Sequence, residues 1–227
     1  MQRPAPAAVL FDLDGTLIDS VRLILDSYHH TFAVHGLPAR SDAEWLAGIG
    51  IPLRVVFAGC TDRPEEVERL IATYREYNLT HHDGRVTAYP GVVEMVRAVR
   101  AGGFRTGLVT SKNRPGALRG LKLIGLEADV DVVIGADEVA NPKPHPEPVL
   151  AACRLLGVEP GRALYVGDSV HDMVSGRAAG ALTAAVLWGP FCRGDLEATE
   201  PDHWLERPED LLAVLRRLTV STVNRQP

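Results

Sequence analysis

Apolar residues recur in two different patterns along this chain. Residues 8–11 form a short, bulky and partly β-branched run, which predicts a buried strand. From 18 to 85 the apolar positions recur at helical spacing, with polar residues between them. We therefore expect helices over about 20–35, after Ser41, over 52–57 and over 63–79, with no strand between 18 and 85. Asp19 or Ser20 is the expected N-cap of the first helix, and Gly36 suits its C-terminus.

After residue 85 the pattern alternates between strand and helix. Strands are predicted at 104–109, 130–134, 163–166 and 182–187, and helices at 90–101, 115–124, 146–156, 170–179 and 210–218. Such alternation is typical of an α/β fold, in which helices cover both faces of a parallel sheet. The helical block then becomes an insertion after the first strand, with hinges near 18–20 and 84–90. Closure of this insertion over the strand's carboxyl end would exclude water.

Composition narrows the class of protein. The 227 residues allow one large domain or a domain with a smaller insertion, and 46% hydrophobic with 23% charged residues is typical of a globular protein. The net charge of −5 includes no basic block, which argues against nucleic-acid binding. No segment approaches the ~18–20 apolar residues of a membrane span, and the start is not typical of a secretory signal. Three widely separated cysteines indicate a reducing, cytoplasmic location: Cys60, Cys153 and Cys192.

Two carboxylates end the first predicted strand. Asp12 and Asp14 are two residues apart, so in an extended segment they share a face, and Gly15 lets the chain turn behind them. Carboxylates this close disfavour each other's ionisation, which calls for a cation or a shared proton. A hard divalent ion such as Mg²⁺ suits oxygen ligands. The alternative is a solvated turn, because Asp and Gly are common turn residues.

Three further stretches follow predicted strands, and each has two interpretations. Thr110 and Ser111 would either cap the next helix or, with nearby backbone amides, bind an anion. Lys143 is either a solvated surface group or an ammonium held in place by flanking prolines. Asp168 and Asp172 lie one helical turn apart, either as an acidic helix start or as two ligands pointing the same way. The strand ends of a parallel sheet would gather all of them at one edge.

Together these groups suit phosphoryl transfer. Mg²⁺ and Lys143 would neutralise phosphate oxygens, while Asp12 attacks phosphorus to form an aspartyl-phosphate. Asp14 would protonate the leaving oxygen and then activate water. We expect the neighbouring carboxylates to raise the pKa of Asp14 toward that role. Two histidines receive no catalytic role: His145 is assigned to a helix start and His171 to the surface.

The same motifs resemble those of the haloacid dehalogenase-like hydrolases. The resemblance rests on Asp-Leu-Asp-Gly-Thr-Leu at 12–17, the hydroxyl of Thr110, Lys143 in a proline-rich loop, and Gly-Asp-Ser-x-x-Asp at 167–172, in that order. It implies a Rossmann-like doubly wound parallel sheet core made of 1–17 and 86–227. It also implies a helical cap domain at 18–85, inserted after the first strand.

The resemblance also assigns roles to the candidate residues. Asp12 becomes the nucleophile and Asp14 the acid and base. Mg²⁺ is held by Asp12, by the backbone carbonyl of Asp14 and by Asp168, with Asp172 in support. The phosphoryl group is bound by Thr110, Ser111 and Lys143. An aspartate at position 14 looks like a phosphatase or phosphomutase rather than a dehalogenase.

Within that family, 89–91, 109–112 and 141–146 look most like the phosphoglycolate phosphatase group, and the pyrophosphatase branch is similar in the same places. Segment 48–54 resembles a cap stretch aimed at the site, where Arg54 would bind the non-reacting end of an anionic substrate; the alternative is an exposed helix arginine. We therefore expect a Mg²⁺-dependent phosphatase acting on 2-phosphoglycolate.

Several alternatives stay open. Within the superfamily they are an inorganic pyrophosphatase and a sugar phosphomutase. The alternative of another class is a phospho-receiver-like signalling domain, against which Asp14 and the helical insertion argue. As partners we expect a small phosphorylated metabolite, no nucleic acid and no membrane, in a monomer or homodimer.

Overall fold

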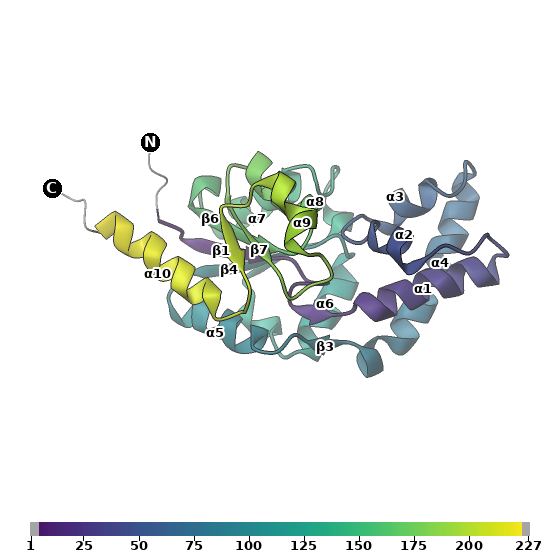
Figure 1. Cartoon of the computed structure of the whole chain (residues 1–227), viewed down its shortest axis with the longest axis horizontal. Helices are drawn as coiled ribbons and strands as arrows, with labels where there is room; N and C mark the ends of the chain where they lie inside the picture. Colours follow the sequence, from purple (N-terminus) through teal and green to yellow (C-terminus); the bar gives the residue numbers. More distant parts are fainter. Residues whose placement is uncertain (1–4, 224–227) are drawn as a thin grey trace.

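Six parallel strands form the central sheet, in the order β5-β4-β1-β6-β7-β8 (Figure 1). The computed structural model describes residues 5–223, and its sheet consists of β1 (Ala8–Phe11), β4 (Arg105–Val109), β5 (Val132–Ile134), β6 (Ala163–Gly167), β7 (Leu182–Val186) and β8 (His203–Leu205). The chain places β4 on one side of β1 and β6 on the other. Ligand crevices of doubly wound sheets form where the strand order reverses in this way, outside the carboxyl ends of the strands.

Helices cover both faces of this sheet. One face carries α5 (Val92–Ala101), α6 (Arg114–Leu123) and α10 (Asp210–Val223), and the other α7 (Glu147–Leu156), α8 (Val170–Ala178) and α9 (Arg193–Leu196) (Figure 1). The side chains of β1 alternate between the two layers. Val9 and Phe11 pack with α5, α6 and α10, whereas Ala8 and Leu10 pack with α7. Burial on both faces explains the uninterrupted apolar run and confirms the predicted doubly wound α/β fold.

Four helices form a separate group beyond the carboxyl end of β1, which we call the helical unit (Figure 1). They are α1 (Val21–Val34), α2 (Asp42–Leu46), α3 (Leu53–Ala58) and α4 (Pro64–Arg85). The helical unit has its own apolar cluster, distinct from those of the sheet. At its centre the rings of Tyr28 and Trp45 stack 4.5 Å apart, and Phe32 meets the edge of Trp45 at 4.6 Å.

The chain enters and leaves the helical unit through two short strands that pair with each other. β2 (Ile18–Asp19) and β3 (Thr87–Ala88) form an antiparallel ladder of two residues. We expected no strand between 18 and 85, so β2 is a difference from the sequence analysis. Two residues are too few to leave a period-2 pattern, which explains why the ladder is absent from the prediction.

Most predicted elements are confirmed to within a few residues. The exceptions are α4, which continues to Arg85, and the unpredicted β8 and α9. Four 3₁₀ turns complete the description: Glu127–Asp129, Ala136–Glu138, Pro160–Arg162 and Glu197–Thr199. Residues 1–4, part of the start for which no secretory signal is predicted, lie outside the described residues. Within 5–223, none of the helices combines the length and apolar character needed to cross a lipid bilayer.

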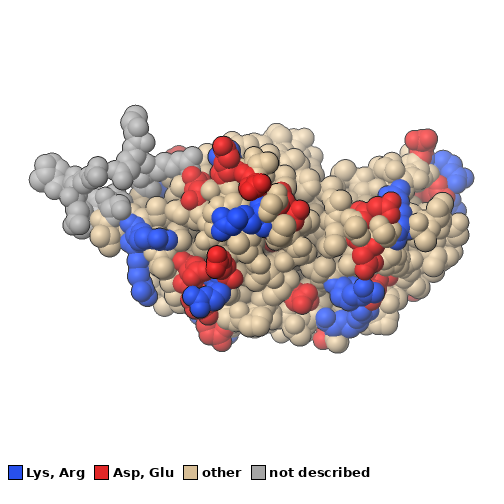
Figure 2. All heavy atoms as spheres, in the orientation of Figure 1, with Lys and Arg blue, Asp and Glu red and all other residues tan. Residues whose placement is uncertain are grey.

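Acidic and basic side chains are interspersed over the molecular face drawn in Figure 2. On this face the Lys and Arg side chains of the described residues occur in small groups next to Asp and Glu, over both the sheet layers and the helical unit. This distribution agrees with a sequence that has a net charge of −5 and no basic block.

Candidate active site

Asp12 stands at the central strand's carboxyl end. Its backbone N–H donates to the carbonyl of Val166 at 2.9 Å, which continues the β1–β6 ladder by one residue, and its side chain is buried. The chain then turns sharply at Gly15, which has a φ of 86°. A Cβ on Gly15 would lie 2.4 Å from Oδ2 of Asp168, so only glycine allows this turn to pass so close to a carboxylate.

Lys143 is buried between carboxylates. Its Nζ lies 3.0 Å from Oδ1 of Asp12 and donates to Oδ1 of Asp172 at 2.6 Å, with 1% of the side chain exposed. Burial by itself would lower the pKa of Lys143, but the two carboxylates raise it above its usual value, so the ammonium stays charged. The interpretation of Lys143 as a solvated surface group is therefore wrong.

Asp12, Asp168 and Asp172 form what we call the acidic cluster. All three are buried, and each offers a carboxylate oxygen within 4.8 Å of the others. Burial raises the pKa of Asp12 to about 7, although Lys143 opposes the rise, and burial with Asp172 raises the pKa of Asp168 well above its usual value. If all three were ionised, the acidic cluster would carry more negative charge than one lysine offsets, and the raised pKa values reflect that cost.

Asp172 has two structural partners besides Lys143. It closes a capping box with Ser169 at the start of α8, and it accepts a hydrogen bond from the hydroxyl of Tyr165 at 2.8 Å. Burial favours a higher pKa for Asp172, but Lys143, Ser169 and Tyr165 together lower it. The two interpretations of Asp168 and Asp172 are therefore both correct: they lie at the acidic start of a helix, and their carboxylates converge. The N-cap of that helix is Ser169 and not Asp168.

The acidic cluster fits a divalent cation. Oδ1 of Asp168 accepts a hydrogen bond from the hydroxyl of Thr16 at 2.8 Å, but its Oδ2 is buried and accepts none. A buried carboxylate oxygen without a donor is costly unless a cation or proton reaches it. An all-oxygen donor set with excess negative charge suits Mg²⁺ better than softer metals.

The carboxylate of Asp14 has hydrogen-bond partners outside the acidic cluster. Its carboxylate accepts from Nζ of Lys112 at 2.9 and 3.1 Å and from the hydroxyl of Ser20 at 2.6 Å. Burial favours a higher pKa, but Lys112 and Ser20 lower the pKa of Asp14 below its ordinary value. The expectation that neighbouring carboxylates raise this pKa is therefore wrong, because a cation and a hydroxyl, not the acidic cluster, contact Asp14.

Lys112 is a candidate functional residue to which sequence reasoning gave no role. It follows Thr110 by two positions in a segment noted only for its resemblance to the phosphoglycolate phosphatase group. Its partner Asp14 is 98 residues away along the chain, so no local pattern reveals the pair. Ser20 is also used differently from the expectation, because it occupies the N-cap of α1 without capping it through its side chain.

The hydroxyls after β4 do not cap the next helix. Asn113 is the N-cap of α6, which excludes that alternative for Thr110 and Ser111. Oγ1 of Thr110 accepts from the backbone N–H of Lys112 at 3.2 Å, and the hydroxyl of Ser111 donates to the carbonyl of Gly50 in the helical unit at 2.5 Å. Phosphate binding by these two residues stays a prediction.

Three other candidates have distinct surroundings. Arg54 lies on the exposed surface of α3, where it forms an ion pair with Glu68, and its contact with substrate stays a prediction. His145 accepts from the backbone N–H of Glu147 at the start of α7, as its assignment to a helix start predicts. His171 is half-buried and its Nδ1 is buried without a partner, so its assignment to the surface is wrong.

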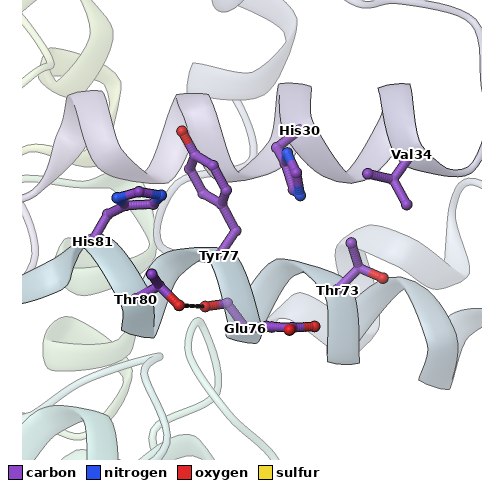
Figure 3. A pocket seen from close by; sticks show the side chains of 7 residues that line it. All are labelled: His30, Val34, Thr73, Glu76, Tyr77, Thr80 and His81. Atoms are coloured by element: carbon purple, nitrogen blue, oxygen red, sulfur yellow. Dashed lines mark hydrogen bonds between the residues drawn. The ribbon is translucent and has the colours of Figure 1, made fainter.

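A groove of about 320 Å³ lies elsewhere, between α1 and α4 of the helical unit (Figure 3). The ring of Tyr77 lies 4.3 Å from that of His30 and 4.4 Å from that of His81. The groove is lined by His30, Val34, Thr73, Glu76, Tyr77, Thr80 and His81. None of these residues belongs to the acidic cluster, and none is among the partners of Lys143 or Asp14 described above. The groove is therefore separate from the candidate active site.

The buried strand end, the carboxylates and the paired lysine define a hydrolase site on a Rossmann-like core. The family profile of the haloacid dehalogenase-like hydrolases matches residues 9–186, and the chain belongs to this family. Among its relatives is the pyrophosphatase PpaX of Bacillus cereus (strain AH820), 43% identical over 207 residues, which covers 91% of this chain and 95% of that protein. The pyrophosphatase PpaX of Bacillus velezensis is also 43% identical, over 208 residues, with the same shares covered.

Solved structures agree with the fold. A haloacid dehalogenase-like family hydrolase from Streptococcus pneumoniae superposes with a TM-score of 0.80 at 25% identity, over 92% of this chain and 98% of that one. A structure described as a predicted phosphoglycolate phosphatase from Haemophilus somnus 129pt gives a TM-score of 0.84 at 24% identity, over 92% and 97%. At that identity the second likeness concerns the fold alone.

Proposed function

We propose that the protein is a Mg²⁺-dependent phosphatase that forms an aspartyl-phosphate on Asp12 and hydrolyses it. The observation that carries the proposal is the buried convergence of Asp12, Asp168 and Asp172 at the carboxyl end of the central strand, with the ammonium of Lys143 paired to Asp12 and Asp172. A phospho-receiver domain would share an aspartate, a cation and a lysine. Asp14 supports turnover instead, because it supplies a proton-transfer group two residues from the nucleophile.

Each side chain has a defined task in this scheme. Mg²⁺, bound by the acidic cluster, would offset the carboxylate charge and polarise the phosphoryl oxygens. Lys143 holds Asp12 in place and neutralises charge on the transferring group. An oxygen of Asp12 attacks phosphorus, the bond to the leaving oxygen breaks, and Asp14 donates a proton to that oxygen. Asp14 then takes a proton from water, whose attack on phosphorus releases phosphate and frees Asp12.

For the substrate, we propose inorganic pyrophosphate first and 2-phosphoglycolate second. The leaving oxygen must come within hydrogen-bond reach of Asp14, and Nζ of Lys112 is 2.9 Å from that carboxylate. An ammonium there favours an anionic leaving group, as both phosphate and glycolate are. The relatives at 43% identity are named pyrophosphatases, which supports pyrophosphate, the alternative named in the sequence analysis, over 2-phosphoglycolate.

Phosphate release from a substrate panel tests the proposal. The panel contains pyrophosphate, 2-phosphoglycolate, β-glucose 1-phosphate and 4-nitrophenyl phosphate, each with Mg²⁺ and with EDTA, and Asp12→Asn is the control for the nucleophile. We expect Mg²⁺-dependent release with the highest kcat/KM for pyrophosphate, and none from Asp12→Asn. A preference for 2-phosphoglycolate would change the substrate and keep the chemistry, whereas no Mg²⁺-dependent release from any compound would overturn the proposal.

A further inference from the structure

Tyr165 is a buried tyrosine of β6 that has no role in the chemistry proposed above. It pairs with Leu10 of β1 in the sheet, and none of its surface is exposed. Leu10 and Asp12 are two positions apart in an extended segment, so their side chains point to the same face. The ring of Tyr165 lies in the apolar layer on that face, which contains Leu10. The tyrosine is therefore part of the support directly behind the candidate active site.

The hydroxyl of Tyr165 reaches two acceptors on different elements. It lies 2.8 Å from Oδ1 of Asp172 at the start of α8 and 2.9 Å from the carbonyl of Val109 at the end of β4. A phenol has one hydrogen to donate, and a charged acceptor makes the stronger hydrogen bond, so Asp172 is the favoured partner. Because β1 lies between β4 and β6, this side chain spans the strand that carries the nucleophile.

The two oxygens of Asp172 are held by different groups. Oδ2 accepts from the backbone N–H of Ser169 at 3.0 Å and from its hydroxyl at 2.6 Å. Oδ1 accepts from Nζ of Lys143 at 2.6 Å and from Tyr165. Tyr165 thus shares with the ammonium the oxygen that draws Lys143 toward α8. Without the phenol, that oxygen would attract the ammonium more strongly, since fewer donors would share its charge.

The ring of Tyr165 is held as closely as its hydroxyl. Nζ of Lys143 lies 5.9 Å from the ring centroid, within the range of a cation–π contact. On the side of α8, a Cβ on Gly176 would lie 3.2 Å from Cδ1 of the ring. The ring therefore has little room to shift, and it contacts Lys143 both directly and through Asp172.

We infer that Tyr165 is a positioning residue, which acts through Asp172 to keep Nζ of Lys143 beside Asp12 and the transferring phosphoryl group. The inference rests on the proposed phosphatase function and adds a residue to it. Tyr165 does not touch the reacting atoms. Loss of its hydroxyl should therefore weaken binding of the transition state more than binding of the substrate, because the charge that Lys143 neutralises is best matched in the transition state.

The neighbouring strand β7 offers a matched control. Thr183 pairs with Tyr165 in the sheet, is buried, and has a hydroxyl that donates to Oδ2 of Asp202 at 3.2 Å, outside the candidate active site. Tyr165→Phe and Thr183→Val thus each remove a buried hydroxyl that donates to a carboxylate, with little change of shape. Urea unfolding verifies that each variant is folded.

Two measurements with Mg²⁺ present test the inference. The first is kcat and KM for pyrophosphate or 2-phosphoglycolate, whichever the wild type turns over faster. The second is calorimetric binding of orthovanadate, which adopts the five-coordinate geometry of phosphoryl transfer, and of inorganic phosphate. Tyr165→Phe should lower kcat about tenfold or more and raise the Kd of orthovanadate by a similar factor, with smaller changes in KM and in the Kd of phosphate. Thr183→Val should change only the free energy of unfolding.

The route through Asp172 is tested in a double-mutant cycle. In an Asp172→Asn background, Tyr165→Phe should raise the Kd of orthovanadate much less than it does in the wild type. Equal factors in the two backgrounds would overturn the inference. So would a Tyr165→Phe variant whose kcat and orthovanadate Kd match the wild type, while the proposed function stands. A wild type that releases phosphate from neither substrate would overturn the proposed function, and the inference with it.

Discussion

Replacing Asp12 with asparagine exchanges a charged oxygen for an NH₂ group in the most crowded part of the acidic cluster. Without metal, burial raises the pKa of Asp12 from 3.8 to about 7, since burial together with Asp172 outweighs the attraction of Lys143. A rise of about 3 pH units corresponds to about 4 kcal/mol by which the folded state disfavours the ionised carboxylate. Asparagine has no such cost, so Asp12→Asn should stabilise the metal-free protein while abolishing turnover.

The gain depends on pH in a defined direction. A carboxyl group with a higher pKa in the folded state holds its proton more tightly there. Its stabilising contribution is complete below the unfolded-state value of 3.8 and is lost as the pH rises through about 7. The advantage of Asp12→Asn over the wild type should therefore be small in acid, grow toward neutrality, and reach at most about 4 kcal/mol near pH 8.

Urea unfolding in EDTA at pH 5.5 and pH 8 measures this difference. The exposed Asp62, changed to asparagine, controls for the substitution itself. Adding Mg²⁺ should stabilise the wild type, because a ligand of the folded state shifts the unfolding equilibrium, and should stabilise Asp12→Asn less. The electrostatic reasoning would be refuted if Asp12→Asn were less stable than the wild type at pH 8 in EDTA. It would also be refuted if the difference in unfolding free energy between the two proteins were the same at pH 5.5 and pH 8. Wild-type turnover by Asp12→Asn would refute the nucleophile.

Three further outcomes are expected. Lys112→Met should let the pKa of Asp14 rise, which moves to higher pH the acidic limb of the pH–rate profile for the step in which ionised Asp14 takes a proton from water; an unmoved limb would contradict the pairing. Burial lowers the pKa of His82 below 6.5, so the contribution of this residue to stability should fall between pH 7.5 and 5.5, and the stability of His82→Leu relative to the wild type should rise over that range in urea unfolding. Trp45→Ala should cost about 3–5 kcal/mol of unfolding free energy, because the indole is buried against Tyr28; a cost below about 1 kcal/mol would show that the cluster re-packs.

The elements that could be predicted are those with a long pattern. β1 is apolar at every position because it is buried on both faces, and α5 and α7 repeat apolar residues over ten positions each. By contrast, β8 is a three-residue edge strand with the residues His203, Trp204 and Leu205, which show no recognisable alternation. It owes its extended form to pairing with β7, a contact that local sequence does not encode.

The same distinction applies to the candidate active site. Asp12, Lys143 and Asp168 follow strands, and the rule that parallel strand ends meet at one edge was enough to predict that they lie together. The partners of Asp14 could not be predicted, because Lys112 reaches it across 98 residues and its ammonium reverses the expected direction of the pKa. The half-buried position of His171 likewise involves a tertiary contact, with Gly50 between α2 and α3, which no periodicity reports.

The position of β1 in the sheet also determines when the enzyme can be completed during synthesis. Residues 8–11 leave the ribosome early, yet their two neighbouring strands are paired through Arg105 and Ala163. The buried apolar residues of the helical unit's cluster all lie within 21–85, so it can form while the nucleophile's strand still has no neighbour. Elongation at about 5–20 residues per second places on the order of 10–30 s between β1 and the end of β6. The nascent chain exposes an apolar strand with two open edges until β4 is made and with one open edge until β6 is made, which makes it a substrate for chaperones before it is a catalyst.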